Sequence, residues 1–143
     1  MFIMKVSIPI FLFVLLLSGC PKVTNEPGYN LGETIMLKPN QPVKIRSENI
    51  YLLLTEVKDS RCPKEVNCVR AGEAKVAVDF GVGDAVSALE LEAKGLCFKE
   101  DGSCGESTDA QGYKVQLYNV YPYPVESTTK EENYTAKVMV TKQ

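Results

Sequence analysis

The chain has 143 residues, with 16 Lys and Arg against 18 Asp and Glu, and its net charge is −2. The length suits one domain with a single core, and the charge balance excludes the basic surface that a nucleic-acid-binding protein needs. Histidine is absent, which removes the usual general base, the Ser-His and Cys-His nucleophile pairs and the commonest metal ligand. An enzyme that works through carboxylates stays an alternative, and no cofactor is predicted.

The first twenty residues have the pattern of a secretory signal. Lys5 precedes an apolar block from Val6 to Leu17, and small residues follow just before Cys20. The block is too short to cross a bilayer, which takes about 20 apolar residues. The ending Leu17-Ser18-Gly19-Cys20 resembles the lipobox of bacterial lipoproteins, in which the cysteine thiol receives a diacylglycerol and cleavage falls just before it. The resemblance implies a signal peptide over residues 1–19, lipidation at Cys20, and a membrane anchor in the bacterial cell envelope.

The segment after Cys20 is rich in Pro, Gly and Asn and has no apolar period. It predicts a lipidated tether over residues 20–32, followed by a single β domain over residues 33–143.

Strand patterns begin at residue 33. Thr34–Lys38 and Val43–Arg46 flank a turn that contains two prolines, which predicts a hairpin. The near-continuous apolar run from Asn49 to Val57 predicts a buried strand.

Alternation of apolar and polar residues predicts further strands over residues 73–80, 87–94, 113–121 and 134–141. A short helix competes for Ala85–Lys94, because Ala, Leu and Glu favour helix. The alternation there is strict and favours the strand. About seven short strands with turns between them predict a small antiparallel β-sandwich or barrel.

Four cysteines follow Cys20, and an even number in an exported domain predicts two disulfides. Local pairing of Cys62 with Cys68 and of Cys97 with Cys104 closes short loops, each worth about 2.5 kcal/mol by chain entropy. A long-range pair such as Cys62 with Cys104 would give about 4 kcal/mol, yet local encounter and the turn residues in each loop favour the short pairing. A zinc site is disfavoured, because C-x5-C and C-x6-C are wider than the usual spacings.

The most distinctive stretch runs from Asp59 to Ala74. It contains Arg61-Cys62-Pro63, four further residues, Cys68 and then Gly72. Together with the lipobox and the strand end Pro122-Tyr123-Pro124, it resembles a group of small, uncharacterised bacterial lipoproteins and exported proteins. The resemblance implies a β fold and supplies no activity.

The Cys62–Cys68 loop is the candidate binding loop, through Arg61, Lys64 and Arg70. It joins two strands and so lies at one end of a sheet, where binding residues are commonly placed. A disulfide would fix its shape in advance and lower the ordering cost of binding. The predicted partner is an envelope protein or a cell-wall component. The alternative is that Arg61 and Arg70 only pair with Asp59 and Glu73 at the surface, worth about 0–1 kcal/mol.

Two further stretches are ambiguous. Asp101, Ser103, Glu106 and Asp109 are interpreted as a solvated acidic loop, since their spacing does not match a calcium loop. Three tyrosines stand at an aromatic-proline strand end. They favour either an interface or simple core packing of Tyr121 before Pro122 ends the strand; the three are Tyr118, Tyr121 and Tyr123.

Overall fold

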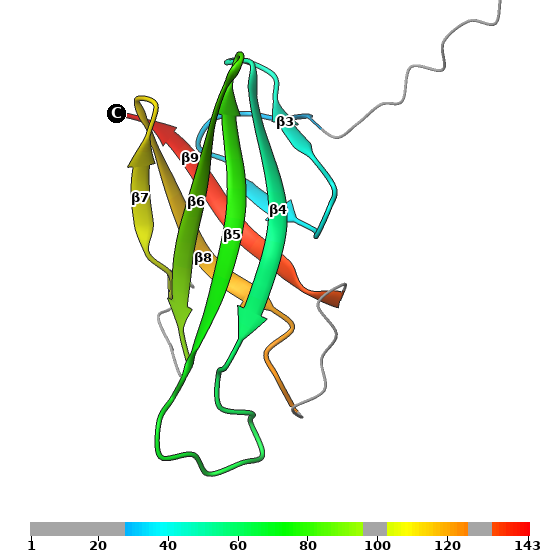
Figure 1. The fold of residues 1–143 in the computed structure, drawn as a ribbon, viewed down its shortest axis with the longest axis vertical. Helices are drawn as coiled ribbons and strands as arrows, with labels where there is room; N and C mark the ends of the chain where they lie inside the picture. The colour runs from blue at the N-terminus through cyan, green and yellow to red at the C-terminus, as the bar shows by residue number, and fades with distance from the viewer. Residues whose placement is uncertain (1–27, 96–102, 126–132) are drawn as a thin grey trace, which may run out of the picture.

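The computed structural model describes residues 28–95, 103–125 and 133–143, which form two β-sheets packed on one another (Figure 1). The strand order is β1-β3-β4-β5-β6 in the first sheet and β2-β9-β8-β7 in the second. The prediction of an all-β sandwich is confirmed. The strands are β1 (Gly28–Tyr29), β2 (Thr34–Leu37), β3 (Val43–Ile45), β4 (Ile50–Asp59), β5 (Glu73–Val82), β6 (Ala85–Lys94), β7 (Ser107–Ala110), β8 (Tyr113–Tyr121) and β9 (Thr135–Lys142).

Three ten-residue strands, β4, β5 and β6, make up most of the first sheet. In β4, Ile50, Leu52 and Leu54 are buried, while Tyr51 and Leu53 point to the other face and are half-buried. The apolar run therefore supplies both faces of a central strand. Residues 85–94 form a strand paired with β5 along its whole length, so the alternation predicted this segment correctly.

The core lies between the sheets and is built by the inward residues of each strand. A fully buried side chain of this kind stabilises the fold by about 1.5–3 kcal/mol. The largest fully buried side chains are Phe80, Ile35, Leu37, Ile45, Ile50, Leu52, Leu54, Leu91 and Leu117.

The predicted hairpin between residues 34–38 and 43–46 is wrong. β2 pairs with β9 in the second sheet, and β3 pairs with β4 in the first. The turn carries the chain from one sheet to the other: Pro39 bridges to Leu54, and the backbone N–H of Asn40 donates to the Leu54 carbonyl at 2.9 Å. Both β2 and β3 direct apolar side chains into the core, but each strand is the neighbour of a strand in a different sheet.

Two strands lie in stretches that the sequence did not mark. β1 falls inside the predicted tether, pairs in parallel with β3, and is followed by a hydrogen bond from Gly32 N–H to the Val140 carbonyl at 2.8 Å. β7 falls inside the predicted acidic loop and pairs with β8. The domain therefore includes residues 28–32.

The predicted signal peptide and Cys20 lie outside the described residues, and the described part contains no helix long and apolar enough to cross a membrane.

The segment Cys104–Glu106 joins the two sheets along one seam. On one side, the N–H of Lys94 donates to the Cys104 carbonyl at 3.1 Å and the N–H of Glu106 donates to the Glu92 carbonyl at 2.8 Å. On the other side, the N–H of Leu117 donates to the Glu106 carbonyl at 2.9 Å. Beyond Glu106 the chain leaves β6 and continues as β7 in the second sheet.

A hydrogen bond joins the sheets at the end opposite to the Cys62–Cys68 loop. The Tyr113 hydroxyl donates to Glu48 Oε2 at 2.8 Å, and the Tyr113 ring packs edge-on against Phe80 with 6.0 Å between ring centroids. The hydroxyl lowers the pKa of the Glu48 carboxyl. The carboxylate, and then burial, raise the pKa of Tyr113.

Tyr113→Phe should destabilise the protein at pH 7 and much less at about pH 3. Because the pKa of Glu48 is lower in the folded chain than its ordinary value of 4.5, the bond stabilises the protein above that value, and its contribution disappears as the pH falls through the lowered pKa. The phenylalanine ring keeps the packing on Phe80. Urea unfolding at both pH values measures the effect. Tyr51→Phe is the control and should show no such change, and a Tyr113→Phe difference independent of pH would contradict the prediction.

Candidate functional site

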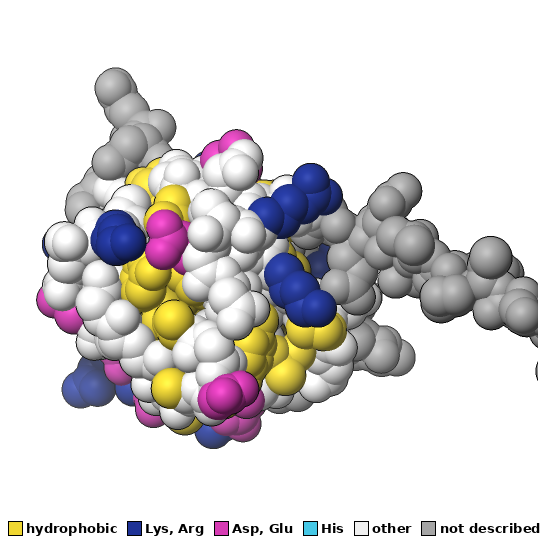
Figure 2. Space-filling view, turned by 90° about the horizontal axis from the view of Figure 1, so that it is seen from above, with side chains coloured by type: hydrophobic (Ala, Val, Ile, Leu, Met, Phe, Trp, Pro, Cys, Tyr) yellow, Lys and Arg dark blue, Asp and Glu magenta, His cyan; other side chains and the backbone are white. Residues whose placement is uncertain are grey.

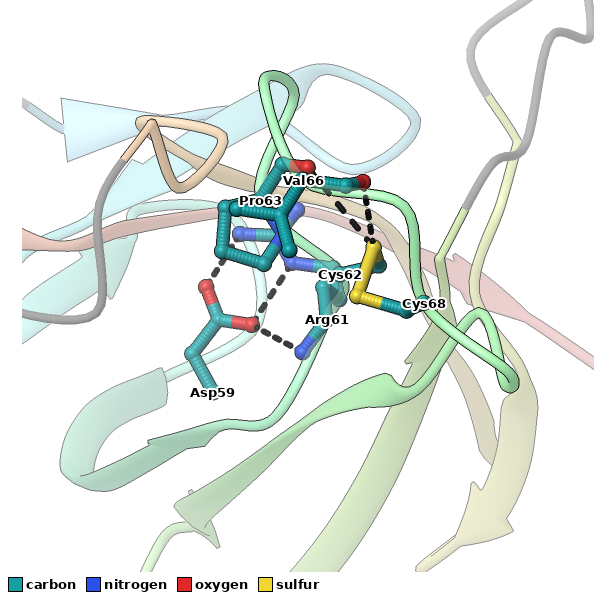
Figure 3. Close-up of a disulfide and its surroundings, with 6 residues drawn as sticks. All are labelled: Asp59, Arg61, Cys62, Pro63, Val66 and Cys68. Carbon is teal, nitrogen blue, oxygen red and sulfur yellow. Dashed lines mark hydrogen bonds and ion pairs between the residues drawn. A yellow bond between two sulfur atoms is a disulfide. The ribbon is translucent and has the colours of Figure 1, made fainter.

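The loop between β4 and β5 hangs from the lower end of the domain in Figure 1. The disulfide predicted between Cys62 and Cys68 is present, with their Cα atoms 5.9 Å apart (Figure 3). Inside the ring, the N–H of Val66 donates to the Pro63 carbonyl at 3.2 Å. The disulfide and this turn give the tip a defined shape before any partner arrives.

The base of the loop continues the β4–β5 pairing. The N–H of Ser60 donates to the Glu73 carbonyl and the N–H of Cys62 donates to the Ala71 carbonyl, both at 2.8 Å. The N–H of Gly95 donates to the Gly72 carbonyl at 2.9 Å, which adds a contact from the end of β6. The loop is therefore anchored on both of its arms.

Arg61 is the buried charge at the centre of this region, with only 1% of its side chain exposed. Its guanidinium makes a bidentate ion pair with Asp59, Nε to Oδ1 at 2.9 Å and Nη2 to Oδ2 at 2.6 Å. It also donates to the carbonyl oxygens of Val120 at 2.9 Å and Pro122 at 3.1 Å, and to Asn119 Oδ1 at 3.4 Å. All five N–H donors of the guanidinium are thus used.

These bonds tie the loop of the first sheet to the end of β8 in the second. The Tyr123 ring lies against the guanidinium, 4.7 Å from its carbon to the ring centroid. The N–H of Lys64 donates to the Pro124 carbonyl at 3.1 Å, and Lys64 Nζ lies 5.8 Å from the Tyr123 ring centroid. Figure 3 shows the Arg61 and Asp59 side chains pointing toward one another to one side of the disulfide.

The expected role of Arg61 needs correction. Its side chain is buried, so it belongs to the support of the loop and not to an exposed binding surface. It does pair with Asp59, as the alternative interpretation held, but the pair is buried and not at the surface. Burial leaves Lys64 and Arg70 as the exposed cations of the predicted set, and their binding role stays a prediction.

The tip of the loop exposes apolar side chains beside its charges. Val69 is fully exposed, and Val66 is 54% exposed. Arg70 makes no ion pair with any residue in ranges 28–95, 103–125 and 133–143; the expected partner, Glu73, contacts Lys75 at 3.3 Å instead. An aliphatic tip with an unpaired cation is a surface suited to a partner with both apolar and acidic groups.

The aromatic-proline strand end packs against this loop. Tyr121 is 41% exposed, so the expectation that it packs in the core is wrong. Tyr123 instead provides the contact to Arg61, two residues beyond the cis peptide bond between Tyr121 and Pro122. Tyr118 lies on the outer face of the second sheet, where Lys137 Nζ is 5.7 Å from its ring centroid.

Of the second predicted cysteine pair, the structure describes only Cys104. Cys104 is disulfide-bonded. Cys97 lies outside the described residues, as Cys20 does, so the pairing of Cys97 with Cys104 stays a prediction. Within the described ranges, no cluster of three or more Cys, Asp or Glu residues is placed to hold a metal ion.

The residues that sequence reasoning missed are those that hold Arg61. The sequence identifies Asp59 only as a surface partner, and it connects neither Asn119 nor Tyr123 with Arg61. Comparison of the chain with protein-family models, with curated proteins and with solved structures gives no match. The functional argument therefore rests on the chemistry of this chain.

Proposed function

We propose that the protein is a lipid-anchored binding module of the bacterial cell envelope. In this proposal its partner, an envelope protein or a cell-wall component, binds the tip of the Cys62–Cys68 loop. One observation carries the proposal. The buried Arg61 fixes the base of the loop and the disulfide closes its tip, while the side chains of Lys64, Val69 and Arg70 stay exposed. A rigid loop loses little conformational freedom on binding, so more of its contact energy becomes affinity.

β1, within the predicted tether, and the Cys62–Cys68 loop lie at opposite ends of the domain, which supports a loop that faces away from the membrane. β1, the first described strand, pairs with Lys44 and Ile45 beside the start of β4. The loop follows the far end of β4, about 30 Å away for a strand of this length. In Figure 1 the chain enters the domain near the upper end and the loop lies at the lower end. A lipid at Cys20 would therefore leave the loop facing away from the membrane.

The upper end carries a modest basic character. In Figure 2, which looks down on this end, some Lys and Arg side chains lie close together on one side of the surface, and others lie on the opposite side. A pocket of about 270 Å³ there is lined by Lys44, Ile45, Arg46, Asn49, Ile50, Tyr51 and Gly83. The two cations that line this pocket, Lys44 and Arg46, fall short of the four to eight that hold a protein on anionic lipid. Membrane attachment in this proposal therefore depends on the lipid.

An enzyme that uses carboxylates stays the alternative. Such a site would be favoured by clustered carboxyl groups with raised pKa in a cleft. Three carboxyl groups of the described part have a clearly shifted pKa, and in each the pKa is lowered by a hydrogen bond, from Asn30, Tyr113 or Lys75 respectively: Glu33, Glu48 and Glu92. A purely structural envelope protein is the third possibility.

Cys20→Ser should release the protein from the membrane fraction, because the lipobox would lose its acceptor thiol. Fractionation and intact-mass analysis of the protein from a bacterial host measure this. The wild-type chain should begin at Cys20 and carry the mass of attached acyl groups. A wild-type mature chain without that added mass would contradict lipidation.

Photo-crosslinking on intact cells tests the binding role. A photoreactive residue at position 69, at the loop tip, should give a discrete crosslinked product, while the same residue at position 47, exposed in the turn between β3 and β4 at the opposite end, should not. Lys64→Ala combined with Arg70→Ala should weaken the product without changing the melting temperature. Equal products from both positions, or none from position 69, would place binding elsewhere.

A further inference from the structure

β6 differs from the other strands at the edges of the two sheets. The edge strands β1, β2 and β7 have two, four and four residues. β6 has ten residues and is the last strand of its sheet. Proteins commonly keep edge strands short or protect them, because an open edge offers unpaired backbone groups to another chain.

Among residues 28–95, 103–125 and 133–143, backbone hydrogen bonds on the outer side of β6 reach only its lower half. At the upper end, the side chain of Gln111 donates to Ser87 Oγ at 2.9 Å. The hydrogen bonds of Glu92 and Lys94 to the segment Cys104–Glu106 show that even-numbered residues of β6 direct their backbone groups away from β5. The same alternation directs the N–H and C=O groups of Val86, Ala88 and Glu90 to the open side. In the part of the chain that the structure describes, no strand pairs with β6 on that side above Glu92.

The open half of β6 lacks the usual protection. The run from Ala85 to Leu91 contains no Lys and no Pro, the two residues most used to block an edge. Val86 is 55% exposed. Leu89 on β6 and Ala110 on β7 are only partly buried, although both pack against the core. A strand added beside β6 would cover this apolar surface.

The charges around the open edge are acidic. Asp84 stands just above it, and Glu90 and Glu106 stand at its lower limit; all three are exposed. None of them makes an ion pair with a residue that the structure describes. A segment that carries Lys or Arg would therefore find unpaired carboxylates at both ends of the edge.

We propose that the upper half of β6 binds an extended, basic polypeptide segment of a partner protein by strand addition. The backbone groups of Val86, Ala88 and Glu90 supply the hydrogen bonds, and Asp84 and Glu90 receive the basic side chains. A second copy of this chain fits less well, because antiparallel pairing about Ala88 places Asp84 of one copy opposite Glu92 of the other, with Glu90 as its diagonal neighbour. The site is separate from the Cys62–Cys68 loop and does not depend on the function proposed for that loop.

The test uses the full-length protein in mild detergent and a labelled peptide that alternates lysine or threonine with valine. Fluorescence anisotropy measures binding. Ala88→Pro removes one outward N–H and no bond to β5, so it should weaken binding at least tenfold, whereas Ala88→Val keeps the N–H and should bind as the wild type does. Glu90→Lys should also weaken binding and should favour a peptide with glutamate in place of lysine.

Each outcome decides the proposal. If Ala88→Pro fails to fold by circular dichroism, Glu90→Lys gives the decision on its own. Equal affinity of wild type and Glu90→Lys for the basic peptide would overturn the proposal, as would the absence of binding to the wild type. A dimer in light scattering that Ala88→Pro dissociates would show that a second copy occupies the edge, and would also overturn it.

Discussion

Arg61→Ala should lower the free energy of unfolding by about 3–5 kcal/mol, the usual cost of removing one member of a buried ion pair. The substitution leaves the Asp59 side chain, which is 2% exposed, as a buried charge without its partner. It also removes the donors to the carbonyl oxygens of Val120 and Pro122. Denaturant unfolding followed by circular dichroism measures the loss.

Two controls separate this effect from a simple loss of charge. Arg70→Ala removes an exposed arginine of the same loop and should change the free energy by less than about 0.5 kcal/mol. Arg61→Lys keeps the charge but offers three donors from one nitrogen, so it cannot reach Asp59 and both carbonyl oxygens together. It should lie between the wild type and Arg61→Ala. A cost below about 1 kcal/mol for Arg61→Ala would show that the pair contributes little net stability.

The burial of Arg61 changes how binding by the loop has to be tested. A variant that removes Arg61 together with Lys64 and Arg70 would lose the support of the loop along with its exposed charges. Weakened binding would then report misfolding as much as recognition. The informative variant changes Lys64 and Arg70 alone, since both are exposed in the structure.

The strands that the sequence predicted well are those whose pattern is local. β5, β6, β8 and β9 alternate over eight to ten residues, and alternation depends only on neighbouring residues in the chain. The sheet that β2 joins was not predictable in this way. Ile35 pairs with Val138, a residue about a hundred positions further on, and a short apolar segment carries no mark of its distant partner.

The short strands and the hydrogen bonds that support the loop could not be predicted from the sequence, for related reasons. β1 and β7 have two and four residues, too few to establish a period, and β7 is polar. The disulfide between Cys62 and Cys68 could be predicted because its spacing is local. The three partners of Arg61 at the end of β8 and just beyond it lie 58 to 61 residues further along the chain. Two of them are backbone carbonyl groups, which any sequence provides.

Gly72→Ala should cost about 2–5 kcal/mol, which combines the strain of a left-handed backbone with a steric overlap. Gly72 has φ +67°, and an added Cβ would overlap the carbonyl oxygen of Ser60 and approach Arg61 Cα to 2.9 Å. These atoms belong to the opposite arm of the loop, so the two arms would have to separate. Because the Arg61 side chain is fixed to β8, the separation would strain its hydrogen bonds.

Gly112→Ala provides the matched control for this prediction. Gly112 has φ +81°, yet an added Cβ there meets no atom within 4 Å. It should therefore cost only the backbone strain, about 1–2 kcal/mol. Thermal or denaturant unfolding of both variants measures the difference, which isolates the close approach of the two arms. Equal losses would show that the arms of the loop separate freely, and the loop would then lack the rigidity on which its proposed binding role depends.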